Sequence, residues 1–87
     1  MDPLEREIAQ LIVTSTGLDD EGVRIDDIDP EAPLFGEGLG LDSIDALEIG
    51  VALNGRYGVA LTADSDDSRA HFATLRALAR FVAAHRA

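Results

Sequence analysis

The chain has 87 residues, of which 17 are acidic and seven are basic, and its formal charge is −10. A charge of this sign and size repels nucleic acids and anionic membranes, so neither is expected as a partner, whereas basic proteins are attracted. The sequence has no cysteine, which excludes a disulfide framework and a thiolate metal site, and its length allows one small domain with a thin core.

The acidic residues are concentrated in the first part of the chain. Residues 1–55 carry 14 acidic residues and two arginines, whereas residues 56–87 carry three acidic residues and five arginines. A solvated surface that aids solubility explains any single carboxylate well, but it explains the asymmetry between the two parts less well. No apolar run reaches transmembrane length and the start lacks the pattern of a signal peptide, so we expect a cytoplasmic protein without membrane insertion.

The first predicted element is a helix over residues 3–16. Asp2 with Glu5 three residues later fits a capping box, and Pro3 suits the first helical position. Gly17 is a suitable stop at the C-terminal end. The residues that recur at helical spacing are Leu4, Ile8, Leu11, Ile12 and Ser15.

Residues 18–41 are predicted to form a long loop. The segment has no sustained periodicity, carries two clusters of acidic residues, and includes Pro30 and Pro33. Loops of this length in compact domains are usually functional or disordered. The apolar residues that could pin this loop over a core are Val23, Ile25, Ile28, Leu34 and Phe35.

The next predicted helix runs from Ser43 to about Tyr57. Asp42 is a good N-cap after a glycine-rich approach, and Gly58 follows the last turn. Ser43 therefore places one hydroxyl at a corner between loop and helix. The helix dipole favours negative charge there, and an added phosphate would also sit at this N-terminus.

This helix carries apolar residues on two nearly opposite sides. The first side, sufficient for a core face, consists of Ala46, Ile49, Leu53 and Tyr57. The second side, which we call the outer stripe, consists of Ile44, Leu47 and Val51. A helix of a small domain cannot bury both sides well, so an exposed outer stripe rimmed by Asp45 and Glu48 is predicted to be a docking surface. The alternative is that the long loop folds back over the stripe. Within the helix, Gly50 could let another segment approach closely.

The end of the chain is predicted to hold a short helix over residues 66–71 and a final helix capped by Thr74. Several N-cap residues lie within residues 62–68, and the final helix has core spacing at Leu75, Leu78, Phe81 and Val82. Asp64, Asp66 and Asp67 suggest a calcium loop, but the glycine and glutamate of that motif are absent. The predicted fold class is all-α, a small bundle of three main helices and one short helix.

Ser43 could be a catalytic nucleophile, but its surroundings argue against this. The sequence around it is not the Gly-x-Ser-x-Gly elbow of hydrolases. The two histidines, His71 and His85, lie in the polar C-terminal part, and a chain this small would struggle to bury a triad. Taken alone, a serine at a helix start is more often structural than functional.

The stretch around Ser43 resembles the phosphopantetheine attachment motif of acyl carrier proteins, of the free-standing bacterial type. The residues that carry the resemblance are Leu39-Gly40-Leu41-Asp42-Ser43-Ile44-Asp45 followed by Leu47-Glu48-Ile49. The similarity extends over nearly the whole chain, including the long loop with Leu34-Phe35, the Tyr57-Gly58-Val59 segment and Phe72-Ala73-Thr74-Leu75. Ile44 is a mild departure, because many carriers have leucine there. Peptidyl carriers, which are less acidic, fit less well.

The resemblance implies that a phosphopantetheinyl transferase attaches 4'-phosphopantetheine from coenzyme A to the hydroxyl of Ser43, next to Asp42. The protein would then be a non-catalytic carrier that holds an acyl chain as a thioester. Acyl-transferring and ketosynthase-type enzymes with basic patches are the implied further partners. The residues implied to contact partners are Ile44, Asp45, Leu47, Glu48 and Val51. The residues implied to line the acyl chain are Phe35, Ile49 and Leu53.

Three interpretations remain open for a single domain over residues 1–87. The first is a monomeric carrier for fatty acyl or polyketide chains, and the sequence from Phe35 to Ile49 favours a dedicated pathway such as aryl polyene synthesis. The second is an unmodified acidic adaptor that binds a protein partner through the helix over residues 43–57. The third, a small serine hydrolase, is much less favoured.

Overall fold

The computed structural model describes residues 1–36, 38–61 and 66–86. Within these ranges the chain is helical, without strands, and the predicted all-α fold is confirmed. Two short 3-10 helices lie within residues 18–41, the predicted loop. The helices, in chain order, are α1 (Pro3–Thr16), 3-10 helices at Leu18–Glu21 and Ile25–Asp27, α2 (Ser43–Tyr57), α3 (Asp66–His71) and α4 (Leu75–His85).

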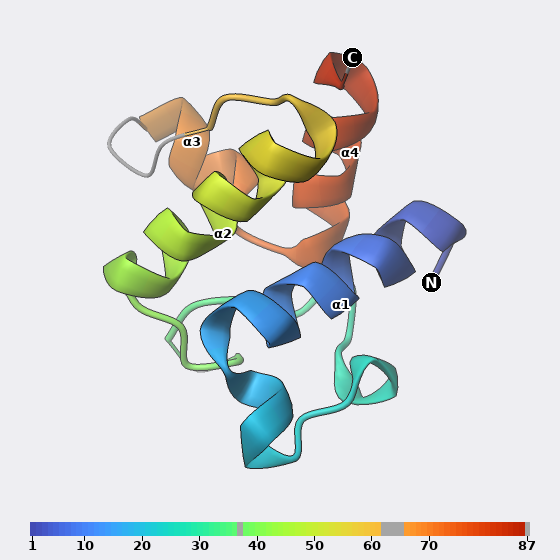
Figure 1. The fold of residues 1–87 in the computed structure, drawn as a ribbon, viewed down its shortest axis with the longest axis vertical. Helices are drawn as coiled ribbons and strands as arrows, with labels where there is room; N and C mark the ends of the chain where they lie inside the picture. Colours follow the sequence, from blue (N-terminus) through green and yellow to red (C-terminus); the bar gives the residue numbers. More distant parts are fainter. Residues whose placement is uncertain (37, 62–65, 87) are drawn as a thin grey trace.

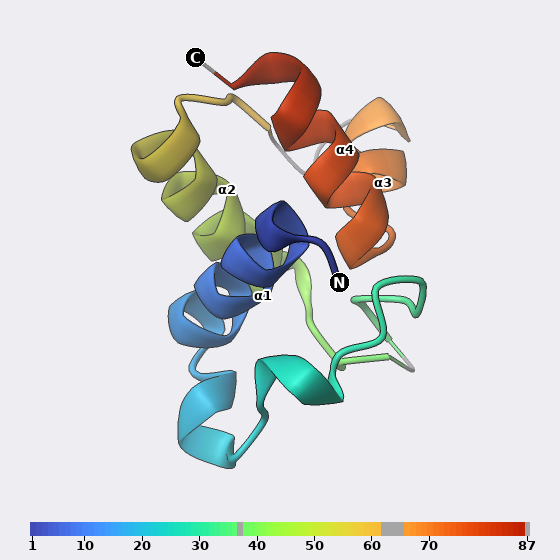
Figure 2. The same cartoon turned by 90° about the vertical axis from the view of Figure 1, so that its right-hand side faces the viewer.

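The bundle is organised around α1, which packs on both α2 and α4 (Figure 1). The view turned by 90° shows the same crossing, with the segment that joins α1 to α2 at the end of the molecule away from the C-terminus (Figure 2). The short α3 packs beside α4. None of the helices in the described ranges is long and apolar enough to cross a membrane.

The ends of α1 and α2 lie at the predicted residues because local hydrogen bonds define them. In α1, the Asp2 carboxylate accepts from the Glu5 amide at 2.7 Å and the Glu5 carboxylate accepts from the Asp2 amide at 2.9 Å. Gly17 and Gly58 end the two helices in left-handed conformations with φ of 77° and 71°, which glycine adopts without steric cost. The predicted capping box and both glycine stops are therefore confirmed.

The core lies between α1, α2 and α4. Its fully buried side chains come from all three helices, and they include Ile8, Ile12, Ile49, Leu53, Leu75, Leu78 and Val82. A Cβ added to Gly50 would lie 2.8 Å from the carbonyl oxygen of Leu61. This contact confirms that another segment approaches α2 closely at Gly50.

The segment between α1 and α2 is held against the start of α4. The Leu34 amide donates to the Ala73 carbonyl at 3.1 Å, and the Arg76 amide donates to the Pro30 carbonyl at 2.9 Å. Of the predicted anchors, Ile28 and Leu34 are buried, whereas the others are partly buried. The described part of the segment does not cover the outer stripe of α2, so the alternative in which it folds back over that stripe is wrong.

The final helix begins as predicted, with the Thr74 hydroxyl accepting from the Ala77 amide at 3.0 Å. The N-cap candidates at residues 62–65 lie outside the described residues, as does Asp64 of the calcium pattern. No group of three or more potential ligands for a metal ion occurs in the ranges that the structure describes.

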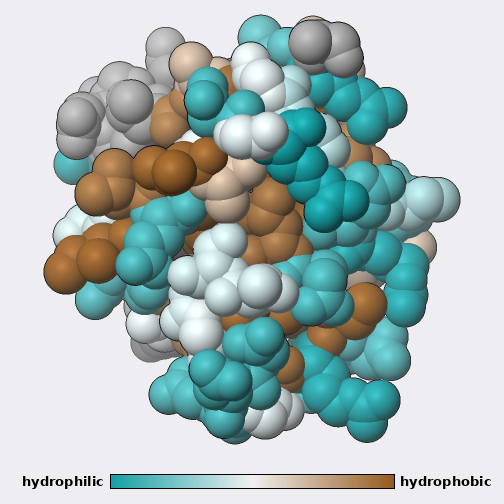
Figure 3. Space-filling model, viewed as in Figure 1, coloured by the Kyte–Doolittle hydropathy of each residue, from teal (hydrophilic) through white to brown (hydrophobic). Residues whose placement is uncertain are grey.

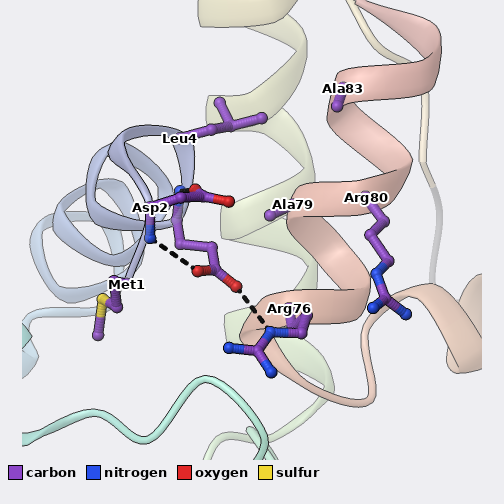
Figure 4. Close-up of a pocket in the computed structure, with 8 residues that line it drawn as sticks. Met1, Asp2, Leu4, Arg76, Ala79, Arg80 and Ala83 are labelled. Carbon is purple, nitrogen blue, oxygen red and sulfur yellow. Dashed lines mark hydrogen bonds and ion pairs between the residues drawn. The ribbon is translucent and has the colours of Figure 1, made fainter.

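A charged clasp joins α1, the long segment and α4. The Glu5 side chain is buried and its carboxylate accepts from the Arg76 guanidinium at 3.1 Å, while Arg76 also pairs with Glu31 at 2.8 Å. Figure 4 shows the hydrogen bond and ion pair that connect Asp2, the Glu5 side chain and Arg76, beside an open pocket of about 420 Å³. Arg80 extends into the same region from the next turn of α4. This pocket does not contain Ser43.

Candidate functional site

Ser43 is exposed at the first position of α2, and Asp42 fixes the corner on which it stands. One oxygen of the Asp42 carboxylate accepts from the amides of Ile44 and Asp45, each at 3.0 Å. In return the Asp42 amide donates to the Asp45 carboxylate at 3.0 Å. The Ser43 hydroxyl itself makes no hydrogen bond to the described residues. The corner therefore presents an accessible hydroxyl on a fixed backbone.

The same capping box changes the expected surroundings of a phosphate at this corner. The amides of Ile44 and Asp45 already donate to Asp42, and the Ala46 amide donates to the Asp42 carbonyl at 3.0 Å. A phosphate on Ser43 would thus lie beside the helix start without receiving these amides. The general preference of anions for helix N-termini is met here by the protein's own carboxylate.

An open pocket of about 430 Å³ lies beside Ser43. Its lining is mainly apolar and comes from the long segment, α2, α3 and the residues before α4: Phe35, Leu41, Asp42, Ser43, Ala46, Arg69 and Phe72. The rings of Phe35 and Phe72 meet edge to face, with centroids 6.2 Å apart and planes at 77°. Such a surface can shelter an apolar group held close to the serine.

The three residues predicted to line an acyl chain are not equivalent in the structure. Phe35 lines the pocket, but Ile49 and Leu53 do not, because both are fully buried between the helices. Sequence reasoning missed Leu41, Ala46, Arg69 and Phe72 as lining residues. Phe72 and Leu41 belong to the segments that carried the family resemblance, whereas nothing in the sequence indicated that Arg69 lies in this pocket.

The outer stripe of α2 is exposed, with Ile44 at 66%, Leu47 at 66% and Val51 at 67% relative exposure. Figure 3 shows hydrophobic side chains at the surface over α2, next to hydrophilic ones. Asp45 is half-buried and Glu48 is exposed beside the stripe. The exposed stripe that the sequence predicted is confirmed, while its role in docking stays a prediction.

Among the described residues that line the pocket next to Ser43 there is no histidine. Instead, His71 and His85 each pack against Phe81, with ring centroids 4.6 Å and 4.3 Å from that of the phenyl ring. The His85 ring contacts the Phe81 carbonyl through Nδ1 at 2.9 Å. The described lining residues thus provide no imidazole base for the serine, and they do not form a hydrolytic site of the serine–histidine type.

Comparison with known protein families bears directly on this corner. A family model described as "Phosphopantetheine attachment site" matches residues 6–82, which include Ser43, the outer stripe and the pocket. No match was found among curated proteins. Domains of the matched family carry covalently attached 4'-phosphopantetheine and are in general carriers without catalytic activity. The chain therefore belongs to the phosphopantetheine attachment site family and is a member of the acyl carrier protein family.

Proposed function

We propose that this protein is a non-catalytic acyl carrier and that Ser43 is its attachment residue. The observation that carries the proposal is the accessible hydroxyl at the capped start of α2, inside the region that matches the family. The sequence motif around Asp42 and Ser43 supports the same assignment. The chain acts in this proposal as a single carrier domain over residues 1–87, and its strong negative charge favours a monomer.

The residues at the corner suit 4'-phosphopantetheine. The Ser43 oxygen would be bonded to the phosphate of the group, and the adjoining apolar pocket offers shelter to whatever the arm carries. When bound, the group supplies a terminal thiol that holds an acyl chain as a thioester. The protein has no cysteine, so no thiol of its own would compete for the acyl chain.

The residues near Ser43 would have different roles in presenting the serine and in contacting the acyl chain. Asp42 holds the backbone at the start of α2, so that the serine is presented in one orientation. Phe35 and Phe72 would contact the first part of the acyl chain. Ile49 and Leu53 would reach the chain only if α2 moved away from the core, because both are sealed from solvent.

The outer stripe would dock the enzymes that load and use the carrier. Ile44, Leu47 and Val51 offer apolar contact area, while Asp45 and Glu48 offer negative charge to basic patches. The expected partners are a phosphopantetheinyl transferase and acyl-transferring or ketosynthase-type enzymes. Complementary charge speeds association without requiring tight binding, which suits a shuttle. The cargo would be a fatty acyl or polyketide chain, including the aryl polyene type.

Intact-protein mass spectrometry before and after incubation with coenzyme A and a broad-specificity phosphopantetheinyl transferase tests the proposal. We expect one phosphopantetheinyl mass to be added, and fragmentation should place it on Ser43. Ser43→Ala should abolish loading but change the unfolding free energy by less than about 0.5 kcal/mol, because the side chain is exposed. Ser15→Ala, which removes a hydroxyl from α1, should load like the wild type and serves as the matched control.

The adaptor remains the second candidate because the outer stripe is exposed in the unmodified chain. A well-folded chain that gains no mass, and that is unmodified when purified from its native host, would favour the adaptor. Loading at another hydroxyl would support the carrier function but contradict the assignment of Ser43 as the attachment residue.

A further inference from the structure

We infer that Arg69, on α3, binds the phosphate through which the arm is attached to Ser43, and that it thereby positions the start of the arm against the apolar pocket. This inference rests on the proposed function. Arg69 and Ser43 line the same pocket although they are far apart in the sequence. Arg69 would be a positioning residue, since the chemistry of the carried thioester takes place at the far end of the arm.

The first step of the argument is the charge around Ser43. Carboxylates of Asp42 and Asp45 flank the serine, and a phosphodiester on Ser43 would add another negative charge beside them. Like charges within a few ångströms repel each other unless a cation or hydrogen-bond donors compensate. The amides of Ile44, Asp45 and Ala46 at the start of α2 do not provide those donors, because they already donate to Asp42.

The second step is the supply of positive charge. Among the described residues that line the pocket, Arg69 is the one basic residue. The nearest base along α2 is Arg56, which lies 13 residues from Ser43, or about 20 Å along a helix, and which pairs with Glu7 at 3.3 Å. The packing of α3 therefore places the Arg69 guanidinium beside the same pocket as Ser43, at a corner where Asp42 and Asp45 are acidic.

The third step is the capacity of the side chain. Arg69 already takes part in another interaction, but a guanidinium has five N–H donors and can serve two partners at once. Its planar fork matches two phosphate oxygens, which gives an arginine contact more directional character than a lysine contact. Because Arg69 is exposed, its substitution should not disturb the core.

The test compares loaded wild type with loaded Arg69→Gln, Arg69→Lys and Arg80→Gln. Arg80→Gln is the matched control, since Arg80 is an exposed arginine that lines a different pocket. We would record the ³¹P chemical shift of the phosphodiester and the Nε–Hε signal of Arg69 in isotope-labelled protein. Intact mass followed by fragmentation would first establish loading on Ser43. Failure of the proposed function, seen as absent loading, is then distinct from failure of this inference.

We expect loading to shift the Arg69 Nε–Hε signal in the wild type. Arg69→Gln should change the ³¹P shift, Arg69→Lys should give an intermediate value, and Arg80→Gln should match the wild type. About 1 M salt, where the Debye length is about 3 Å, should move the wild-type ³¹P shift toward that of Arg69→Gln. Equal ³¹P shifts in wild type and Arg69→Gln, or equal effects of Arg69→Gln and Arg80→Gln, would overturn the inference. If Arg69→Gln failed to fold, an unmoved Nε–Hε signal on loading of the wild type would overturn it equally.

Discussion

Gly50 and Gly55 occupy the same helix but have different surroundings. A side chain at Gly50 would collide with the carbonyl oxygen of Leu61, whereas a side chain at Gly55 would meet nothing within 4 Å. Alanine is favoured over glycine inside a helix by about 1 kcal/mol, and overpacking costs about 1–3 kcal/mol. The surroundings therefore decide whether an alanine substitution raises or lowers the unfolding free energy at each position.

We expect Gly50→Ala to lower the unfolding free energy by about 1 kcal/mol, because overpacking outweighs the helix preference. Gly55→Ala should instead raise it by about 0.5–1 kcal/mol. Denaturant unfolding followed by circular dichroism measures both effects on the same helix. If both substitutions changed the unfolding free energy equally and with the same sign, the approach of Leu61 to α2 would not limit the side chain at position 50.

At the scale of the element, the two apolar sides of α2 have separate roles. On the core side Ile49 and Leu53 are fully buried and Tyr57 is partly buried, while the outer stripe is about two-thirds exposed. Burial governs the contribution of a side chain to stability, and exposure makes a side chain available to a partner. One helix thus combines a structural face and a proposed docking face.

Leu47→Ala should leave the unfolding free energy within about 0.5 kcal/mol of the wild type. It should lower kcat/KM for loading by the transferase by about fivefold or more, the effect of losing about 1 kcal/mol at an interface. Leu53→Ala is the matched control, and it should cost about 2–5 kcal/mol of stability. Glu48→Arg should also slow loading, most strongly at low salt. A destabilised Leu47→Ala protein that loads normally would mean that the roles of the faces are reversed.

The bounds of α1 and α2 could be predicted because their signals are local. A carboxylate caps each start, and a glycine with positive φ ends each helix, all within a few residues of the element. The site could be predicted only in part. Phe35 comes to the same pocket as Arg69 and Phe72 through packing between distant segments, and the hydrogen bond from Leu34 to Ala73 is likewise non-local. Periodicity within a helix contains no information about such contacts.

At the scale of the whole molecule, the clasp of Glu5, Arg76 and Glu31 connects three parts of the chain. The pKa of the Glu5 carboxyl lies below its ordinary value of 4.5, mainly because the Asp2 amide donates a hydrogen bond to it. The contact with Arg76 lowers the pKa further, whereas burial opposes the shift. The N-terminal amine lowers it further. Because the pKa is lower in the folded state, the stabilisation is present above about pH 4.5 and is lost as the pH falls through the folded-state pKa.

Glu5→Gln should therefore destabilise the protein in a pH-dependent way. Glutamine retains an acceptor for the Asp2 amide but loses the charge that faces Arg76, so we expect a loss of about 1 kcal/mol at pH 7. The difference from the wild type should shrink as the pH falls below 4.5, because the wild-type carboxyl then becomes neutral as well. Glu31→Gln is the control, since the Glu31 side chain is 73% exposed and its contact with Arg76 is screened by solvent. Denaturant unfolding at several pH values measures how much each variant differs from the wild type in unfolding free energy. If the Glu5→Gln difference stayed constant from pH 7 into the acid range, the charge of Glu5 would not stabilise the clasp.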